Sequence, residues 1–323
     1  MPAQRSHTAD QGHLVVASWN VHSGVDGWGR PFDVVAGCQS IDADVLVLQE
    51  TWSAEGGESL ARKVGEALGY RVEESPIARG MMFAPPRGAR RGWGPFPFGH
   101  APYGTRVERA RLMKRRRRTG RGAATAGRGA ATTGRGAATT GGGAATTGRG
   151  AATTGGGPVT DRRLVVESGT IGLAVLSRLE LGSVEVWDLG QRRRDPTRRC
   201  ALAVEVSTGG RDPVLVVGTH LSHLRHASLQ QLKLLRSLIA GRAGGSGREA
   251  AAALVGDLNL PASVLPLLMP GWRRVVRART WPAWRPIAQS DHILVTPGIA
   301  AGGEVLAVAG SDHLPVRARL VWT

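Results

Sequence analysis

The sequence predicts an α/β fold in which two β-sheets pack against each other beneath outer helices. Roughly ten short, β-branched apolar segments have the length of buried strands, whereas only two stretches show helical spacing. This excess of strands favours two packed sheets over a doubly wound sheet, in which strands and helices alternate. Neither a GxGxxG nor a GxxxxGK(S/T) loop follows an expected strand, which disfavours a nucleotide-binding P-loop enzyme.

Segments with strand character lie on both sides of a long polar stretch in the middle of the chain. Residues 13–19 and 44–48 precede that stretch and are short, apolar and rich in β-branched side chains. The other expected strands follow it and comprise residues 164–167, 170–176, 184–189, 200–206, 214–218, 252–255, 293–295, 304–308 and 316–321. Two segments, residues 59–68 and 228–239, carry apolar side chains at helical spacing and are the expected helices.

The basic charge of the chain is concentrated in its middle. The 323 residues carry a net charge of +17, but residues 86–163 alone hold 17 Lys and Arg against 2 Asp and Glu, a net of +15. From Gly120 to residue 154 a seven-residue unit of the type GRGAATT repeats, without the large apolar side chains that a coiled coil needs. Such a composition predicts disorder. We therefore expect one domain over residues 1–323 with a disordered basic insert over 86–163, which is either an expanded surface loop or a tether for polyanions.

Several protein classes are excluded or disfavoured by composition. No run of 18 apolar residues is present, so no membrane-spanning helix is expected. The polar first twelve residues lack the apolar core of a secretory signal. Two cysteines, Cys38 and Cys200, cannot form a disulfide framework or a cysteine-rich zinc site. We expect a cytoplasmic protein without an obligate protein partner.

Polar side chains suited to metal binding and acid–base chemistry recur at the ends of the expected strands. They are Asn20, Glu50, His220, Asp257, Asn259, Asp291, Asp312 and His313. Carboxylate and amide oxygens suit Mg²⁺ or Mn²⁺ better than zinc. Asp257 and Asn259 are two residues apart and point the same way on an extended segment. His313 follows an acid and could act as a general base whose tautomer a second carboxylate fixes.

Seven motifs stand in an order that resembles the endonuclease/exonuclease/phosphatase superfamily, which includes pancreatic-type deoxyribonuclease, abasic-site endonucleases and neutral sphingomyelinases. They span residues 18–22, 48–51, 169–178, 218–221, 255–259, 290–294 and 310–316. The resemblance covers residues 14–85 and 164–322 and leaves out the insert. It implies a four-layer α/β/β/α sandwich of two mixed sheets and cleavage of a phosphoester that depends on a divalent metal, Mg²⁺ or Mn²⁺.

The resemblance also implies a role for each strand-end residue. The expected metal ligands are Asn20, Glu50 and Asp312. The expected catalytic residues are His220, which stabilises the transition state, Asp257, which orients or deprotonates the attacking water, Asn259, which positions phosphate or nucleophile, His313, and Asp291, which orients the His313 ring. A metal and protonated histidines would stabilise the charge that gathers on the phosphate oxygens.

Two further residues are expected to contact substrate. A substrate arginine could come from Arg198 or Arg199, with Arg199 as the expected residue, although a solvated charge run is at least as good an interpretation of the pair. Trp281 opens the segment Trp281-Pro-Ala-Trp-Arg285, which is either an aromatic rim that stacks a base or sugar or a packing loop.

Three functions are compatible with the motifs. The first is a phosphodiesterase acting on nucleic acid or a phospholipid. The second is a phosphomonoesterase acting on a soluble phosphate such as an inositol phosphate. The third is a non-catalytic module that holds nucleic acid through the Arg/Gly insert, which the full set of polar residues disfavours. Outside the insert the net charge is only +2, which argues against a dedicated duplex-DNA enzyme.

Deletion of residues 87–158 is predicted to leave a folded protein that still cleaves bis-p-nitrophenyl phosphate, because the insert carries none of the motifs. Circular dichroism and turnover of this small diester measure the outcome. Loss of folding would show that the insert is structural. A loss confined to long polyanions, with a flatter salt dependence, would support the tether.

Overall fold

The structure, a computed structural model, describes residues 13–83, 105–107, 165–192, 194–195, 197–208, 212–243 and 251–322. The chain divides into one unit of Met1–Glu108 with Leu164–Thr323 and another of Arg109–Arg163, and all described residues belong to the first. Apart from a three-residue strand, the predicted insert at 86–163 lies outside the described residues, so the predicted disorder stays a prediction. Among the described helices, none has the length and apolar character needed to cross a membrane.

Thirteen described strands form two mixed sheets. The first has the order β12-β13-β1-β2-β5-β3-β4 and consists of Ala300–Val305, Val316–Val321, Leu14–Asn20, Val45–Ala54, Val165–Ser177, Arg71–Phe83 and Thr105–Val107. The second has the order β10-β11-β9-β8-β7-β6 and consists of Arg273–Arg274, Asp291–Val295, Ala252–Asp257, Val214–His220, Arg198–Val206 and Leu181–Gln191. The pairs β1–β2 and β8–β9 are parallel, and the other pairs are antiparallel.

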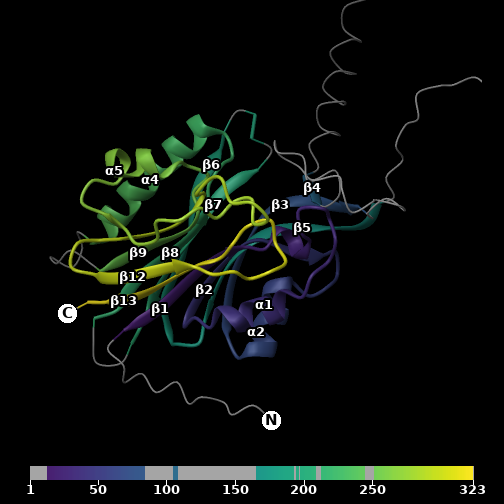
Figure 1. Ribbon diagram of the computed structural model, residues 1–323, viewed down its shortest axis with the longest axis horizontal. Coiled ribbons are helices and arrows are strands. Elements are labelled where there is room, and N and C mark those ends of the chain that lie inside the picture. Colours follow the sequence, from purple (N-terminus) through teal and green to yellow (C-terminus); the bar gives the residue numbers. More distant parts are fainter. Residues whose placement is uncertain are drawn as a thin grey trace, which may run out of the picture. The chain divides into compact units, whose positions relative to one another are not determined.

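Helices cover the outer face of each sheet, which gives four layers (Figure 1). Helices α1 (Val34–Ile41) and α2 (Leu60–Leu68) lie on the first sheet, and α4 (Arg225–Ala243) and α5 (Leu265–Leu268) lie on the second. One buried apolar cluster fills the space between the sheets and includes Val47, Val175, Leu202 and Val216. Two more clusters join each sheet to its helices. The predicted α/β/β/α sandwich is confirmed, and its layers bury apolar surface on both faces of each sheet.

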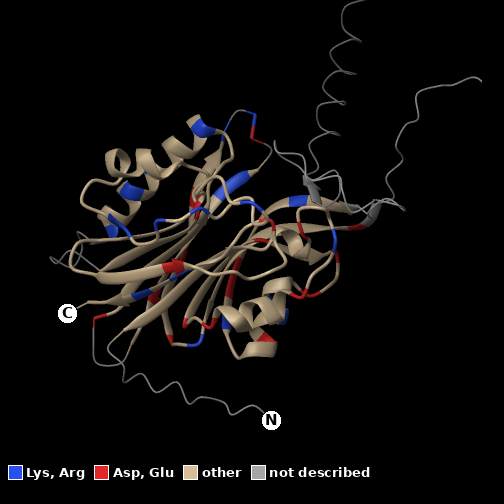
Figure 2. Ribbon diagram, in the orientation of Figure 1, with Lys and Arg blue, Asp and Glu red and all other residues tan. Residues whose placement is uncertain are grey.

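Local signals explain the ends of the two helices on the first sheet. The Asp33 carboxylate accepts a hydrogen bond from the Ala36 amide and caps α1, and the Ser59 hydroxyl accepts one from the Arg62 amide and caps α2. Gly69 ends α2 in the left-handed conformation. The exposed side of α4 carries Lys and Arg positions, which Figure 2 shows in blue.

The elements differ from the predicted ones where the sequence signal is weak. Residues 164–167 and 170–176 belong to a single long strand, β5, and the predicted strand at 304–308 is mostly wrong, because β12 runs over Ala300–Val305. Strand β3 was not predicted, because Pro76 and several charged residues interrupt its apolar pattern. Helix α1 was not predicted, because its β-branched start and Gly37 resemble a loop or strand. Tertiary packing decides the structure in these segments.

Strand pairing brings the polar strand ends together at one rim. In β8 and β9, which are parallel, His220 lies opposite Asp257, and in β9 and β11, which are antiparallel, Asp257 lies opposite Asp291. Gly256 makes this approach possible, because its φ is 153° and a Cβ there would lie 2.0 Å from the Thr219 carbonyl oxygen. The glycine of the Val-Gly-Asp segment is therefore required by the backbone.

Candidate active site

A β-bulge in β2 directs Glu50 to the rim. The pairing of β2 with β5 shifts register between Gln49 and Thr51, and Glu50 between them has a φ of 55°. A bulge adds one residue and re-aims its side chain, and a non-glycine residue in the left-handed region stores strain. The Glu50 side chain keeps 25% of its surface exposed and is thus open to a ligand.

Asn20 joins the two sheets at this rim. It ends β1, is buried, and its Nδ2 donates to Glu50 Oε1 and to Asp257 Oδ2, each at 3.3 Å. Its Oδ1 accepts from the His22 amide at 3.0 Å. Because Glu50 belongs to the first sheet and Asp257 to the second, one amide holds carboxylates from both sheets side by side.

Asp291 and His313 form a buried ion pair. The His313 Nδ1 donates to Asp291 Oδ2 at 2.9 Å, and the Ser290 hydroxyl donates to the same oxygen at 2.9 Å. Trp19 Nε1 donates to the His313 carbonyl at 3.0 Å and fixes the backbone of this segment. With Nδ1 engaged, the free ring nitrogen of His313 is Nε2, which lies 3.9 Å from Asp257 Oδ2.

The ion pair determines the charge of both partners. Burial opposes the charged form of His313, but Asp291 and Asp312 outweigh it and hold the pKa of His313 well above its usual value. Burial likewise opposes ionisation of Asp291, but His313 lowers the Asp291 pKa below its usual value. At neutral pH the pair is therefore an imidazolium and a carboxylate.

Within the described residues, Asp257 accepts no hydrogen bond from a charged group, since the nearest charged nitrogen, His313 Nε2, lies 3.9 Å from its Oδ2. Burial and the nearby charge of Asp291 raise the pKa of Asp257 to about 7. Its Oδ1 accepts from the Asn259 amide at 2.9 Å, which fixes the carboxyl plane. Asn259 itself has a φ of 50° and donates from Nδ2 to the Leu221 carbonyl at 3.0 Å. Asp257 can therefore exchange a proton near neutrality.

His220 faces the same carboxyl group from β8. Its Nε2 lies 3.6 Å from Asp257 Oδ2 and 3.9 Å from Glu50 Oε1. Burial, the charge of Arg199 and the charge of His313 lower the pKa of His220 well below its usual value. His220 is thus a neutral imidazole beside a charged one.

Arg199 lies beneath His220 and not on the open surface. Its side chain is only 7% exposed, its Nε lies 3.5 Å from the buried Asp195 Oδ2, and its Nη1 donates to the His220 carbonyl at 3.5 Å. Neither Arg199 Nε nor Asp195 Oδ2 has a hydrogen-bond partner among the described residues. The structure places this predicted substrate arginine where it acts on the position and charge of His220.

Asp312 and Trp281 meet at the opposite side of the site. The Trp281 Nε1 donates to Asp312 Oδ2 at 3.2 Å, and the ring centre of Trp281 lies 6.4 Å from that of His313. The second carboxylate oxygen of Asp312 lies 3.7 Å from His22 Nδ1. Burial opposes the charged form of each partner, yet their mutual attraction raises the pKa of His22 and lowers that of Asp312.

Two polar residues of the site were not predicted. His22 lies between the charges of Asp312 and Glu50, and its place in the Ser18–His22 motif was a usable signal. Ser290 contacts Asp291, but a serine before an acid is too common to identify from sequence. The structure brings together all eight strand-end residues of the sequence prediction at this rim or next to it.

The donor set fits a hard divalent cation. Four carboxyl groups, those of Glu50, Asp257, Asp291 and Asp312, gather at the rim, whereas His22 and His313 are the histidines there with raised pKa. Oxygen-rich sites of this kind suit Mg²⁺ or Mn²⁺. A bound cation would offset the negative charge of the carboxylates that His22 and His313 do not neutralise.

Among the described residues, a second group of potential ligands differs from the predicted set of Asn20, Glu50 and Asp312. Ligand atoms of Asp257, Asp291 and His313 lie within 4.8 Å of one another. Asp291 Oδ2 and His313 Nδ1 already pair with each other, however, which leaves Asp291 Oδ1, a buried oxygen without a partner among the described residues. In the predicted set, Asn20 presents its amide nitrogen and not its oxygen to Glu50.

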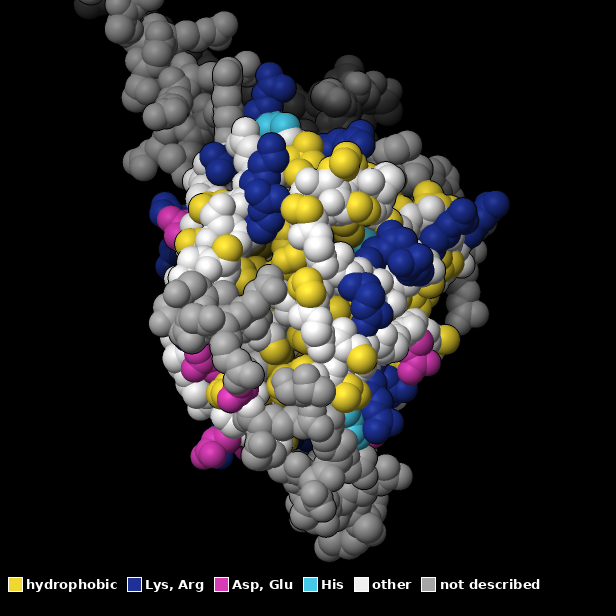
Figure 3. All heavy atoms as spheres, turned by 90° about the vertical axis from the view of Figure 1, so that its left-hand side faces the viewer, with side chains coloured by type: hydrophobic (Ala, Val, Ile, Leu, Met, Phe, Trp, Pro, Cys, Tyr) yellow, Lys and Arg dark blue, Asp and Glu magenta, His cyan; other side chains and the backbone are white. Residues whose placement is uncertain are grey.

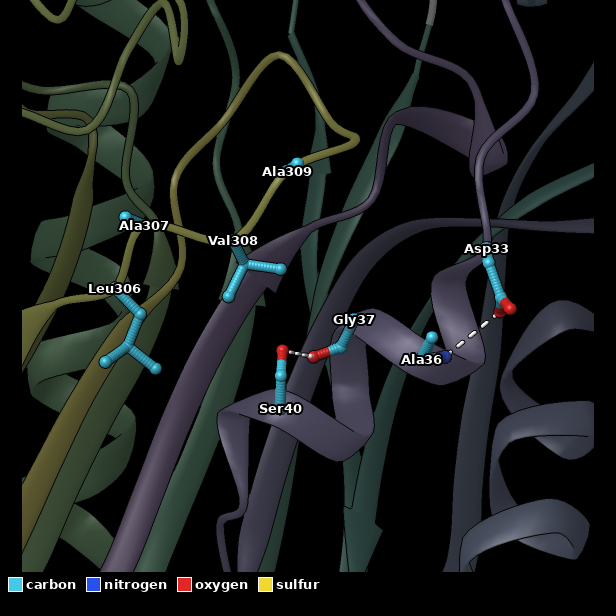
Figure 4. Close-up of a pocket in the computed structure, with 8 residues that line it drawn as sticks. All are labelled: Asp33, Ala36, Gly37, Ser40, Leu306, Ala307, Val308 and Ala309. Atoms are coloured by element: carbon cyan, nitrogen blue, oxygen red, sulfur yellow. Dashed lines mark hydrogen bonds between the residues drawn. The ribbon is translucent and has the colours of Figure 1, made fainter.

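A cavity of about 530 Å³ lies outside this site. It is bounded by α1 and residues 306–309, and Figure 4 shows Asp33, Ser40 and Val308 among its lining side chains. None of the site residues lines it, and its lining has one carboxylate and mostly small side chains. The chemistry of the rim, and not the volume of this cavity, identifies the candidate active site.

Comparisons with known proteins agree with this geometry. The sequence profile described as the endonuclease/exonuclease/phosphatase family matches residues 17–313. Among curated protein sequences, none matches the chain significantly.

Several solved structures share the fold at low sequence identity. An endonuclease/exonuclease/phosphatase from Beutenbergia cavernae has a TM-score of 0.55 and 19% identity, over 97% of this chain and 72% of that chain. A protein of the same family from Bacteroides thetaiotaomicron has a TM-score of 0.56 and 14% identity, over 96% and 95%. TDP2 from C. elegans has a TM-score of 0.52 and 12% identity, over 96% and 75%.

At this identity the structural likeness concerns the fold, and the profile match over most of the chain carries the assignment. Members of the matched family are in general hydrolases of phosphoester bonds and typically depend on a divalent metal. By its ordered motifs, its four layers and its profile match, the chain belongs to the endonuclease/exonuclease/phosphatase family.

Proposed function

We propose that this protein is a phosphodiesterase that depends on Mg²⁺ or Mn²⁺ and acts on nucleic acid or a phospholipid by attack of water. One observation carries the proposal. A charged imidazole, a neutral imidazole and a carboxyl group with a pKa of about 7 converge from the loop before β13 and the ends of β8 and β9, with both imidazole Nε2 atoms within 3.9 Å of the carboxyl oxygen. Such differently tuned groups in one site are typical of acid–base catalysis.

Asp257 is the proposed general base. Its pKa near neutrality lets it accept a proton from a water that attacks phosphorus, and the Asn259 amide and Asn20 Nδ2 hold the carboxyl in place. Asn259 is the proposed residue that positions phosphate or the attacking water.

His313 and His220 are the proposed groups that bind the phosphate. His313 would donate a charged hydrogen bond from Nε2 to a non-bridging oxygen, because Asp291 occupies its Nδ1. His220 would bind another oxygen as a neutral imidazole, kept so in part by Arg199 below it. When bound by Glu50, Asn20 and Asp312, a Mg²⁺ or Mn²⁺ would offset the charge that develops on the phosphate. Trp281 would flank the bound phosphoester through its contact with Asp312.

The described residues on the face of the molecule that carries α4 and α5 lack the continuous basic surface expected of a protein that binds duplex DNA there. Figure 3 shows the side of the molecule with α4 and α5, where basic side chains stand in separate groups among apolar and uncharged ones. Duplex binding generally requires a continuous basic surface. A cytoplasmic location and the lack of an obligate protein partner stay predictions.

The function is tested with the full chain in Mg²⁺ or Mn²⁺, against bis-p-nitrophenyl phosphate and p-nitrophenyl phosphate. Faster turnover of the diester is expected. Preference for the monoester would favour a phosphomonoesterase, and no turnover of either would favour a binding module.

Replacement of Glu50 by Gln is predicted to abolish diester cleavage and to raise the metal concentration that is required. The substitution keeps the shape of the side chain but removes the charge that attracts a hard cation. Turnover against Mg²⁺ concentration measures the effect, with Glu66→Gln on the exposed side of α2 as a control of equal charge change. Full activity of Glu50→Gln in excess chelator would refute the metal site.

Substitutions in the ion pair are predicted to differ in severity. His313→Ala should be nearly inactive and His220→Ala severely impaired, because both remove a phosphate contact. Asp291→Asn should lose about 10²–10⁴ in kcat, since the ring is present but no longer held and charged. KM should change less than kcat in each case. Asp188→Asn, an exposed acid on β6, is the control. Wild-type kcat in Asp291→Asn would show that this acid has only a structural role.

A further inference from the structure

A pair of tryptophans, of which Trp284 is exposed and Trp28 half-buried, lies beside the site and has no part in the chemistry described above. Trp284 is 42% exposed, which is unusual for so large an apolar side chain. Its ring packs at a tilt against Trp28, with 5.1 Å between the ring centres. The Arg30 guanidinium lies over the Trp28 ring at 5.0 Å and pairs with Asp26. Trp284 is therefore the more exposed ring of a tilted tryptophan pair.

The backbone under Trp284 fixes the ring in place. Gly27 lies against it, and a Cβ on this glycine would be 2.6 Å from the Trp284 ring. The loop that carries Trp284 is closed at its base, where the Ile287 and Ala288 amides each donate to the Trp281 carbonyl at 2.9 Å. A ring held in this way loses little conformational entropy when a ligand stacks on it, so binding is opposed less.

The tryptophan pair adjoins the proposed metal ligand Asp312. The Cβ of Asp312 lies 3.4 Å from the position where Gly27 would carry a side chain, so both Asp312 and Trp284 contact the same glycine. The Ala283 amide, next to Trp284, donates to the Asp312 carbonyl at 2.7 Å. A phosphoester bound at the rim would thus place the group attached to its phosphate near the Trp284 ring.

The segment that carries Trp284 is basic, as a surface that binds a polyanion would be. Arg277, Arg279 and Arg285 are exposed in the segment that leads into and contains this loop. No acidic side chain within the described part of the chain forms an ion pair with any of the three. Aromatic rings that stack bases, interspersed with arginines that contact phosphates, are the usual composition of a single-strand-binding surface.

We propose that Trp284, supported by Trp28, stacks the base of the nucleotide next to the scissile phosphate, so that the substrate is a single-stranded nucleic acid. This inference rests on the proposed phosphodiesterase function and narrows its substrate. A lipid surface is the less suitable partner. Membrane anchoring needs apolar side chains that insert below the head groups, whereas the Trp284 ring packs against Trp28 on the protein surface and leaves Ile287 as the other large apolar side chain that this loop exposes.

The test compares two substrates in Mg²⁺: a dinucleoside phosphate and an analogue in which one base is replaced by hydrogen, made for each of the two positions. The measured quantity is the ratio of kcat/KM with and without the base. Trp284→Ala should lower this ratio roughly 5- to 150-fold for one position, the range expected for loss of one base–aromatic stack. Trp284→Phe should keep most of the ratio.

Two further variants separate stacking from structure. Gly27→Ala should lower the same ratio while the tryptophan is still present, because the new methyl group displaces the ring. Leu267→Ala removes an apolar side chain on α5 that is 81% exposed and serves as the matched surface control. It should leave the ratio unchanged.

The remaining outcomes distinguish failure of base stacking on Trp284 from failure of the proposed phosphodiesterase function. Equal losses on both substrates in Trp284→Ala, or a wild-type enzyme indifferent to the base, would refute stacking alone. Sedimentation with phosphatidylserine vesicles that depends on Trp284, without a base effect, would assign the ring to a membrane. If the wild type cleaves neither substrate, the proposed function fails. Quenching of tryptophan fluorescence by the dinucleoside phosphate in chelator, present in wild type and lost in Trp284→Ala, then decides whether stacking survives.

Discussion

The structure depends on the burial of carboxyl groups from both sheets at one rim. The Asn20 amide is the central contact, because it donates to Glu50 on the first sheet and to Asp257 on the second. Buried carboxylates are costly unless they are hydrogen-bonded or paired. Asp291 is hydrogen-bonded to the charged His313, whereas Asp257 lies 3.9 Å from that ring and is opposed by the charge of Asp291, so the two pKa values move in opposite directions. The fold thus places the carboxyl of Asp257, whose charged form burial destabilises, among the proposed catalytic groups.

Local distortions of the strands complete this arrangement. The bulge at Glu50 and the left-handed conformations of Glu50 and Asn259 are costs that the surrounding sheet absorbs. Gly256 admits the Thr219 carbonyl so that His220 and Asp257 lie side by side. Each of these three distortions lies next to a group of the site. Asp312 lies at the same rim, and its carbonyl accepts a hydrogen bond from the Ala283 amide next to Trp284. Asp312 therefore connects the site to the tryptophan pair.

Sequence reasoning reached the layers and the strand-end residues because both follow from strong local patterns. Apolar β-branched runs gave the central strands, and the ordered motifs placed Asp291 beside His313, which the structure shows at 2.9 Å. The bulge at Glu50 could not be predicted from the sequence, because residues 48–51 have the pattern of a continuous strand. The register shift that forms the bulge depends on how β2 pairs with β5. Sequence patterns could not show that Arg199 is buried beside Asp195, because burial depends on tertiary packing. Nor could they show that Trp28 packs against Trp284, because these residues are far apart in the chain.

The pH dependence of folding tests the incompletely offset charge of the buried Asp257 most directly. Because its folded pKa of about 7 exceeds the unfolded value, Asp257 contributes stability below pH ~4 that is lost as the pH rises to about 7. The side chain that Asp257→Asn introduces cannot ionise. In chelator, the unfolding free energy of this variant minus that of wild type should therefore increase by up to roughly 4 kcal/mol between about pH 4 and pH 7, and stay constant above that. Urea unfolding of both proteins from pH 4 to 9 measures the difference. A difference that does not change with pH would contradict the account.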